Sequence, residues 1–479
     1  MNPITRRSFL KQTTLGAAVL GLPARSWAAV PGANDDIRVG VVGFNGRGRD
    51  HISAWTKIKG VRLTALCDVD AKLLDAEAGR LGSGGNTVEA YADIRNLLES
   101  KNVDAISIAT PNHWHALATV WGIQAGKDVY VEKPVSFDVV EGEKMVRAAH
   151  QHDKIVQAGT QSRSSHGIRE AVAWVQKGNL GKIRVARALC YKPRTSIGKT
   201  QGPQPVPANV NYDLWLGPAP LTPPRRRRFH YDWHWFWDYG AGDIGNQGIH
   251  QMDIARWFLG ENALSPRILS VGGRLGYDDD GQTPNTFITF HDYPKAPLIM
   301  EVRGLPEHAG SNEMDKYKGA QIGVVIECEG GHVLVPDYNR ALAFDAQGKE
   351  IQRFEGSINH FENFIHAVRS RRQGDLNAPI IEGHLSSALC HTANISYRIG
   401  SLLAPDSIRE RIKADRDALP TFNRMAEHLA ANNVNLDQTP ATLGAVLKMN
   451  DVNNNFVGND FANALLARPP RQPFALRVA

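Results

Sequence analysis

The sequence predicts an α/β protein in which a doubly wound parallel sheet is followed by a second α/β domain with a largely antiparallel, open sheet. Between residues 37 and 160, short β-branched runs alternate with helical stretches, which is typical of a parallel sheet with crossover helices on both faces. After residue 160, strand-like runs follow one another closely, which favours hairpins and antiparallel pairing. The 479 residues are enough for these two domains and an extension.

Domain boundaries follow from this change of pattern. In the first domain (30–160), we expect strands at 37–42, 61–67, 104–109, 128–131 and 155–158, and helices at 73–81, 94–99, 115–125 and 139–150. In the second domain (161–400), we expect strands at 183–191, 268–275, 286–291, 298–303, 322–328 and 332–335, and helices at 167–176, 247–259, 358–371 and 384–399. Residues 401–479 are polar and Asn-rich, and they are interpreted as a helical C-terminal extension.

A glycine-rich turn, Gly43–Gly48 (GFNGRG), separates the first strand from the following helix. Such a turn leaves backbone N–H groups free at a helix N-terminus, where they can hold a pyrophosphate. Asn45 replaces the usual middle glycine, but Asn tolerates left-handed backbone angles and Gly46 lies beside it. Asp68 ends the next strand, where a carboxylate either accepts hydrogen bonds from a ribose or caps the following helix. The pattern predicts a Rossmann-type dinucleotide site.

The N-terminus has the pattern of a twin-arginine export signal. Arg6 and Arg7 precede a short apolar stretch at 15–22 and small residues at 26–29. The apolar stretch is too short to span a bilayer, and no later segment is apolar enough, so we expect no membrane insertion. The sequence predicts a signal peptide at 1–29 and a mature protein outside the cytoplasm, in the periplasm or its equivalent.

Charge and cysteine content argue against several other classes of protein. The net charge of +6 is modest for this length, and the run Arg225–Arg228 is more typical of a structural or anion-binding loop than of a nucleic-acid site. The four cysteines, Cys67, Cys190, Cys328 and Cys390, are far apart and form no zinc motif. We therefore expect buried thiols and no metal, although an exported protein could also form disulfides.

Three further motifs follow the glycine turn. They are the segment 110–115 (TPNHWH), the tripeptide Glu132-Lys133-Pro134, and the segment 245–253 (GNQGIHQMD). In order and spacing, the set resembles the glucose–fructose oxidoreductase / inositol dehydrogenase / rhizopine catabolism (Gfo/Idh/MocA) family over residues 37–400. The resemblance implies hydride transfer between NAD or NADP and a carbohydrate carbon, and a homo-oligomer that often forms through the open sheet.

The same resemblance implies a set of cofactor-binding residues: Gly43, Asn45, Gly46, Arg47, Gly48, Asp68, Thr110, Asn112, His115, Glu132 and Lys133. Asp68 favours NAD, because a carboxylate there would repel the 2′-phosphate of NADP. Two alternatives stay open: the segment at 110–112 could be a plain turn with an Asn cap, and Glu132 with Pro134 could chiefly set the backbone of the crevice.

The catalytic residues implied are Lys133, His250 and Asn246. Lys133 and His250 can pass the hydroxyl proton as hydride moves. Dehydrogenases of the family usually carry Asp where this chain has Asn246, and an amide can position a hydroxyl but cannot act as a base. Asp243 and Asp253 are nearby carboxylates that could contribute, or Asp253 could simply orient its neighbours.

The substrate candidates are Arg163, Tyr191, Lys192, Trp235 and Asp243. Trp235 belongs to an aromatic run at 229–239, and flat apolar faces beside polar groups suit sugar rings. The same run could equally form a core or a subunit interface.

An export signal and a nicotinamide cofactor are in tension, because a periplasm offers no obvious pool of soluble NAD. We therefore expect an exported sugar or glycoside oxidoreductase with tightly bound NAD. One alternative is an NAD-dependent glycosidase like glycoside hydrolase family 109, which oxidises, eliminates, hydrates and reduces with no net redox change. A non-catalytic sugar-binding protein is a further alternative.

Overall fold

The structure is a computed structural model that describes residues 36–479 except 416, 451–452, 470 and 479. The signal peptide predicted at 1–29 lies outside the described residues.

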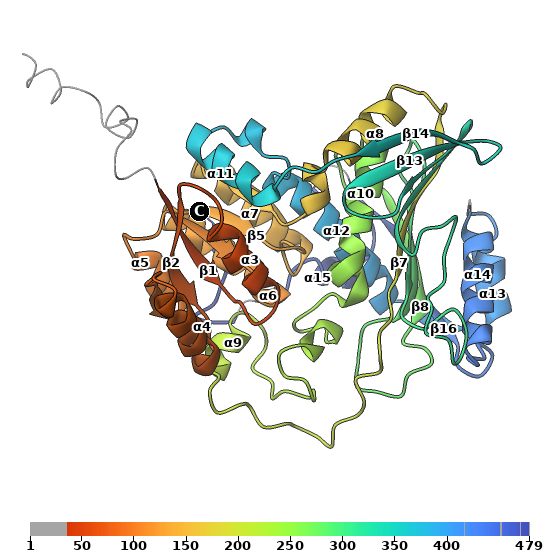
Figure 1. The fold of residues 1–479 in the computed structure, drawn as a ribbon. Helices are drawn as coiled ribbons and strands as arrows, with labels where there is room; N and C mark the ends of the chain where they lie inside the picture. The colour runs from red at the N-terminus through yellow and green to blue at the C-terminus, as the bar shows by residue number, and fades with distance from the viewer. Residues whose placement is uncertain (1–35, 416, 451–452, 470, 479) are drawn as a thin grey trace, which may run out of the picture.

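A parallel six-stranded sheet forms the first domain, in the strand order β3-β2-β1-β4-β5-β6 (Figure 1). Its strands are β1 (Ile37–Val42), β2 (Val61–Cys67), β3 (Glu89–Tyr91), β4 (Ala105–Ile108), β5 (Asp128–Val131) and β6 (Val156–Ala158). This order confirms the predicted Rossmann architecture. The sequence prediction missed β3, because three half-exposed residues carry no apolar run.

The helices of the first domain are α3 (Arg47–Trp55), α4 (Ala71–Ser83), α5 (Ile94–Glu99), α6 (Asn112–Gln124) and α7 (Val139–Gln151). Aspartates cap three of them: Asp70, Asp93 and Asp138 accept backbone hydrogen bonds at the starts of α4, α5 and α7. Helix α6 is buried along nearly its whole length, which is unusual for a crossover helix and shows that other segments cover it.

A mixed, mostly antiparallel sheet of eleven strands forms the second domain in the described part of the chain. Its strands are β7 (Ile183–Tyr191), β8 (Arg267–Gly273), β9 (Thr286–His291), β10 (Leu298–Arg303), β11 (Ile322–Cys328), β12 (Gly331–Val335), β13 (Arg340–Asp345), β14 (Glu350–Glu355), β15 (Ser401–Leu403), β16 (Ala441–Leu443) and β17 (Leu447–Lys448). Strands β7 and β10 pair in parallel, and the other described pairs are antiparallel, as the sequence predicted.

Helices cover both faces of this sheet. The longer ones on one face are α8 (His166–Gln176), α10 (Ile249–Leu259) and α12 (Ile380–Arg398), and α10 and α12 lie between the two sheets (Figure 1). On the far face, Phe422, Met425 and Leu429 pack against Val271 and Ile299. They belong to α14 (Ala418–Ala431), which follows α13 (Pro405–Ile412). The sheet is therefore less open than expected.

Further helical elements complete the described chain: α9 (Tyr212–Leu216), α11 (His360–Ser370), α15 (Asp460–Ala464), the 3₁₀ turns Gln161–Ser164, Asp232–Trp235 and Gln373–Asp375, and a π-helical turn at Ile244–Gly248 that leads into α10. The extension after residue 400 is not only helical, since β15, β16 and β17 join the large sheet. Their short runs of two or three residues left no clear strand pattern in the sequence.

Between β7 and α10 the chain leaves its own sheet and returns along the first domain, where α9 lies near α4 (Figure 1). We call residues 206–239 the cap. The backbone of Val210 bridges to Asp70, and the Ala71 N–H donates to the Asn209 carbonyl at 2.9 Å. The cap core consists largely of aromatic residues, with the Arg226 guanidinium 4.4 Å from the ring centres of Trp215 and Phe229. At least this member of the basic run is structural.

The end of the chain also returns to the first domain. We call the described residues 466–469 and 471–478 the strap. Phe474 is only 2% exposed, because it packs between Trp114 and Trp121 on α6. The Arg468 guanidinium donates to the His113 carbonyl at 2.6 Å. The strap and the cap are thus what bury α6.

All four cysteines are buried and free. The described chain contains no helix that is both long and apolar enough to cross a bilayer.

Candidate active site

The glycine turn has the geometry of a phosphate cradle. Gly43 has a positive φ of 77°, and a Cβ there would lie 2.8 Å from Thr110 Cα, whereas a Cβ on Gly48 would lie 2.1 Å from the Gly43 carbonyl oxygen. Gly46, by contrast, faces open space, since a Cβ on it would have no other atom within 4 Å. Gly43 and Gly48 thus allow close packing, and Gly46 leaves room for a diphosphate at the start of α3. The left-handed angle falls on Gly43 and not on Asn45.

Asp68 braces this turn and faces the same cavity. Its Oδ2 accepts from the Phe44 N–H and its Oδ1 from the Asp70 N–H, both at 3.0 Å. Burial raises the pKa of Asp68 above its ordinary value, against these two hydrogen bonds. The helix cap is Asp70, whose Oδ1 accepts from the Leu73 N–H at 3.0 Å. The residue that caps the helix is therefore Asp70, whereas Asp68 lines the cavity at the position where the sequence predicts a ribose.

A cavity of about 310 Å³ lies over the turn. Every predicted cofactor residue except Gly48 lines it, together with Asn246 and six cap residues: Leu214, Trp215, His230, Tyr231, Trp233 and His234. Gly48 acts instead through packing. The turn offers backbone donors for a diphosphate, and Asp68 offers a carboxylate acceptor. Together with the apolar residues of the cap, they fit a dinucleotide.

Glu132 is held in a buried cluster at the end of β5. Its Oε1 lies 3.0 Å from Arg47 Nε, 3.0 Å from His51 Nε2 and 3.1 Å from Gln161 Nε2. Burial alone would raise the pKa of Glu132, but the hydrogen bond from His51 and the charge of Arg47 hold it well below its usual range. Glu132 therefore sets the geometry of the crevice. The sequence analysis did not predict His51 or Gln161 as partners of Glu132. They lie 81 and 29 residues from it along the chain, and no local pattern links residues so far apart.

Lys133 reaches across the two domains. Its Nζ donates to the Asn246 carbonyl at 2.6 Å, in the π-helical turn before α10. Burial lowers the pKa of Lys133, although the neighbouring Glu132 opposes this. An ammonium group with a lowered pKa and remaining donors can hydrogen-bond a substrate hydroxyl and exchange a proton with it.

His250 lies in the first turn of α10 and is 6% exposed. Its Nδ1 is buried without a hydrogen-bond partner in the described chain, and its ring meets the edge of Tyr338 at a centroid distance of 5.2 Å. Burial, assisted by the charge of Lys133, lowers the pKa of His250 to about 3. The imidazole is neutral near pH 7, so one ring nitrogen carries no proton, although burial makes its protonation costly.

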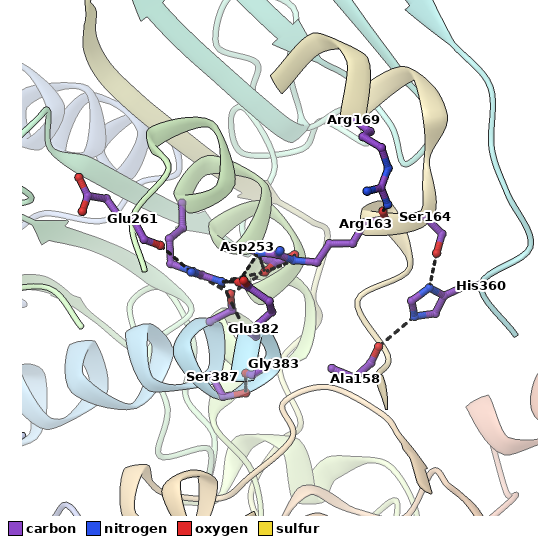
Figure 2. Close-up of polar contacts among 12 residues, drawn as sticks. Ala158, Arg163, Ser164, Arg169, Asp253, Glu261, His360, Glu382, Gly383 and Ser387 are labelled. Atoms are coloured by element: carbon purple, nitrogen blue, oxygen red, sulfur yellow. Dashed lines mark hydrogen bonds and ion pairs between the residues drawn. The ribbon is translucent and has the colours of Figure 1, made fainter. Parts of the chain in front are cut away.

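Two predicted substrate residues lie elsewhere. Tyr191 is 1% exposed and donates to Glu301 Oε2 at 2.8 Å on the far face of the sheet, because side chains alternate along β7. The predicted contact of Arg163 with substrate is also replaced by a different one. Figure 2 shows its guanidinium pointing at Asp253 on α10, with hydrogen bonds of 2.8–3.0 Å, and Glu382 on α12 lies 3.0 Å away. This buried network anchors α10, and it agrees with the interpretation in which Asp253 orients its neighbours.

The other candidates lie around the end of β7 or in the cap. Lys192 Nζ donates to Gln247 Oε1 at 2.9 Å. Asp243 is paired with Arg194, at 2.6 and 2.8 Å, and that guanidinium lies 5.3 Å from the Trp235 ring centre. Neither Asp243 nor Trp235 lines the cofactor cavity. The cap residues Trp233 and His234 line it instead. The aromatic run thus forms both the core of the cap and one side of the cavity.

Comparisons with known proteins agree with this geometry. Residues 37–160 match the NAD-binding Rossmann fold of an oxidoreductase family, and residues 167–301 match the C-terminal α/β domain of the same family. Inositol 2-dehydrogenase 3 of Saccharopolyspora erythraea is 33% identical over 392 residues, which cover 78% of this chain and 97% of that protein.

Two further likenesses are weaker: the first covers less of the chain, and the second has a lower sequence identity. Glycosyl hydrolase family 109 protein 2 of Shewanella sp. (strain ANA-3) is 31% identical over 163 residues, or 29% of this chain and 36% of the hydrolase. The WlbA dehydrogenase of Bordetella pertussis, crystallised with NADH and UDP-GlcNAcA, is 19% identical and superposes with a TM-score of 0.55 over 74% of this chain and 94% of its own. This last likeness concerns the fold. The chain belongs to the Gfo/Idh/MocA family of NAD-binding oxidoreductases.

Proposed function

We propose that this protein is an exported sugar or glycoside oxidoreductase that keeps its NAD bound through the catalytic cycle. The observation that carries the proposal is that residues of the glycine turn line one side of the cofactor cavity and residues of the cap line the other. An enzyme that worked outside the cytoplasm would need such retention, because released NAD would be lost by dilution.

Hydrogen bonds fasten the cap to the cofactor domain. The Trp215 carbonyl lies 2.9 Å from His113 Nε2 and accepts from Trp114 Nε1 at 3.1 Å. At the other end, His230 Nε2 lies 3.1 Å from Asp70 Oδ2. The cap is therefore fixed on both sides of the dinucleotide position.

The strap fastens the cap a second time. The guanidinium of Arg471 contacts both the side chain and the carbonyl of Asp213 in α9, at 2.8 and 2.9 Å. Phe474, next to it, is buried against Trp114 on α6. Because the cap lines one side of the cavity and the strap holds the cap, we expect slow release of the dinucleotide.

Lys133 and Asn246, which line the cavity, and His250, which lies outside its lining, support hydride exchange with a carbinol. Bound NAD would supply the hydride acceptor. Lys133, held at the Asn246 carbonyl, can hydrogen-bond the reacting hydroxyl, and the neutral His250 can take its proton. Asn246 can orient that hydroxyl but cannot take the proton. The reverse transfer to a second sugar would complete a cycle without free NAD.

An NAD-dependent glycosidase is the second candidate, favoured by the likeness to a family 109 hydrolase over 163 residues. In that cycle, oxidation of a hydroxyl acidifies the neighbouring C–H, the glycosidic group is eliminated, water adds, and the hydride returns. It needs the same retained cofactor and differs in its product.

The test uses purified full-length protein without added cofactor. We expect copurified NAD(H) and a change of nicotinamide absorbance with at least one sugar or glycoside. If no saccharide changes the cofactor's redox state, the oxidoreductase proposal is wrong. Release of aglycone in deuterated buffer, with deuterium beside the oxidised carbon, would support the glycosidase instead.

Export is tested separately. Replacing Arg6 and Arg7 by Lys should keep the protein in the cytoplasm of a host with a twin-arginine system, as measured by fractionation. Unchanged export of this variant would contradict that part of the proposal.

A further inference from the structure

Lys192 is a cation without a counter-ion. It follows β7 directly, is half-buried, and its Nζ donates to the neutral Oε1 of Gln247 at 2.9 Å. In the described chain, no carboxylate lies within salt-bridge distance of Lys192 or of Lys133, whose own bond goes to a backbone carbonyl. Lys192 does not line the cofactor cavity, so the diphosphate does not explain it.

Two carboxylates of this region, Asp243 and Glu132, already have cationic or imidazole partners. Asp243, 2% exposed, is paired with Arg194 at 2.6 Å, and Glu132 is bound by Arg47 and His51 at 3.0 Å. Burial is the main cause of the lowered pKa of Lys133, Glu132 opposes it, and the like charge of Lys192 adds to the lowering, so the two ammonium groups repel each other. A ligand anion near Lys192 would relieve this repulsion.

The neighbours of Lys192 lead from it to the catalytic histidine. Gln247 Nε2 donates to the Tyr338 hydroxyl at 2.8 Å, and the Tyr338 ring meets His250 edge-on at 5.2 Å. Because the Tyr338 oxygen accepts from Gln247, its own O–H is left to donate. Lys192 likewise has donors left and no acceptor. A group with only acceptor oxygens fits this arrangement better than a hydroxyl, which would also need an acceptor.

We propose that Lys192, with Gln247 and Tyr338, forms a subsite for a carboxylate carried by the sugar, so that the substrate is a sugar acid such as a uronate. The inference rests on the proposed function, since it assigns the substrate class of the same site. It differs from the sequence expectation, in which Lys192 contacts a sugar hydroxyl.

The test compares matched sugars on the protein with its NAD bound. Calorimetry measures binding of methyl glucoside, methyl glucuronide and glucose 6-phosphate, and of the corresponding galactose set. We expect the uronate to bind about 10- to 100-fold more tightly than the neutral sugar, because hydrogen bonds to charged groups are stronger than those between neutral groups. Equal binding of the neutral sugar, or tighter binding of the phosphate, would overturn the proposal.

Variants locate the effect. Lys192→Met should abolish the preference for the uronate, Lys192→Arg should keep most of it, and Lys192→Glu should shift it towards an amino sugar. Lys177→Met, at an exposed lysine after α8, is the matched control and should change nothing. If Lys192→Met keeps the full preference, the subsite lies elsewhere and the proposal is wrong.

Cofactor absorbance separates the two proposals. Reduction by sugars without any acid preference leaves the oxidoreductase intact and refutes the subsite. Uronate binding that depends on Lys192 without any redox change supports the subsite and refutes the oxidoreductase. Absence of both refutes both.

Discussion

The two sides of the cofactor cavity are built in different ways. On one side, backbone groups of the turn at Gly43–Gly48 stand on parallel strands that are almost wholly buried. On the other side, side chains of the cap, such as Trp215 and His230, lie on a long connection without sheet support. The first side supplies the geometry that recognises a dinucleotide. The second is held by a few hydrogen bonds and the strap, and in the proposed function it is the side that retains the dinucleotide.

The largest expected effect comes from the chemistry between the two sides. Lys133→Met should reduce the rate of cofactor reduction by sugar about 10²- to 10⁴-fold, as loss of a proton-transfer group does. Because Lys133 also lines the cofactor cavity, NAD content is measured beside the rate, and the rate is expressed per bound NAD. Single-turnover absorbance and NAD content after denaturation measure both quantities. An unchanged rate would contradict the role of Lys133.

The recognition side is tested by a matched pair of glycines. Gly48→Ala should cost about 1–3 kcal/mol of unfolding free energy, because its Cβ would meet the Gly43 carbonyl at 2.1 Å. Gly46→Ala has open space in the cofactor-free fold and should leave stability unchanged, yet it should weaken NAD binding where the diphosphate approaches. Thermal unfolding of NAD-free protein and NAD titration separate the two effects. Equal unfolding temperatures of the two variants would contradict this account.

The retention side is tested at the strap. Arg471→Met removes the contacts with Asp213 and should speed NAD release about tenfold, equivalent to about 1.4 kcal/mol. Arg477→Met changes the same residue type at an exposed position of the strap and serves as the control. Release is followed by trapping free NAD with a second dehydrogenase. If both variants release NAD at the wild-type rate, the strap does not hold the cap.

The smallest expected effect concerns pH: the rate of cofactor reduction should not fall as the pH is lowered from 7.5 to 5.5. Because the pKa of His250 is lowered to about 3, it stays neutral from pH 7.5 to 5.5, and the rate should vary by no more than about twofold. A histidine with the usual pKa of about 6.5 would lose about tenfold over this range. A limb near pH 6.5 that disappears in His250→Asn would show that the histidine is not held neutral.

Stability needs its own control in this pH experiment. The unfolded chain protonates His250 below about pH 6.5, whereas the folded chain resists protonation down to about 3. The unfolded state therefore binds more protons, and stability falls as the pH falls through this window. Unfolding temperatures at each pH confirm that the enzyme is still folded where the rate is measured.

Local patterns predicted the recognition side well. The strand at 61–67 and the helix at 94–99 agree with β2 and α5, and the turn, Asp68 and Lys133 all face the cavity. These features depend on backbone angles and apolar periodicity within a few residues. By contrast, Arg163 and Tyr191 were assigned to the substrate, and only the alternation along β7 and the ion pair with Asp253 placed them elsewhere.

By itself, the sequence determined the Rossmann sheet and the dinucleotide turn, because each depends on contiguous residues whose geometry is local. The catalytic roles of Lys133 and His250 stay a prediction. Only the tertiary structure decided which segments line the far side of the cavity and which charged side chains near it are paired. Trp114 meets Trp215, and Arg468 meets His113, across 101 and 355 residues. The free charge of Lys192 is likewise visible only once Arg194 has paired with Asp243. Contacts over such separations depend on how the domains pack, which no local pattern encodes.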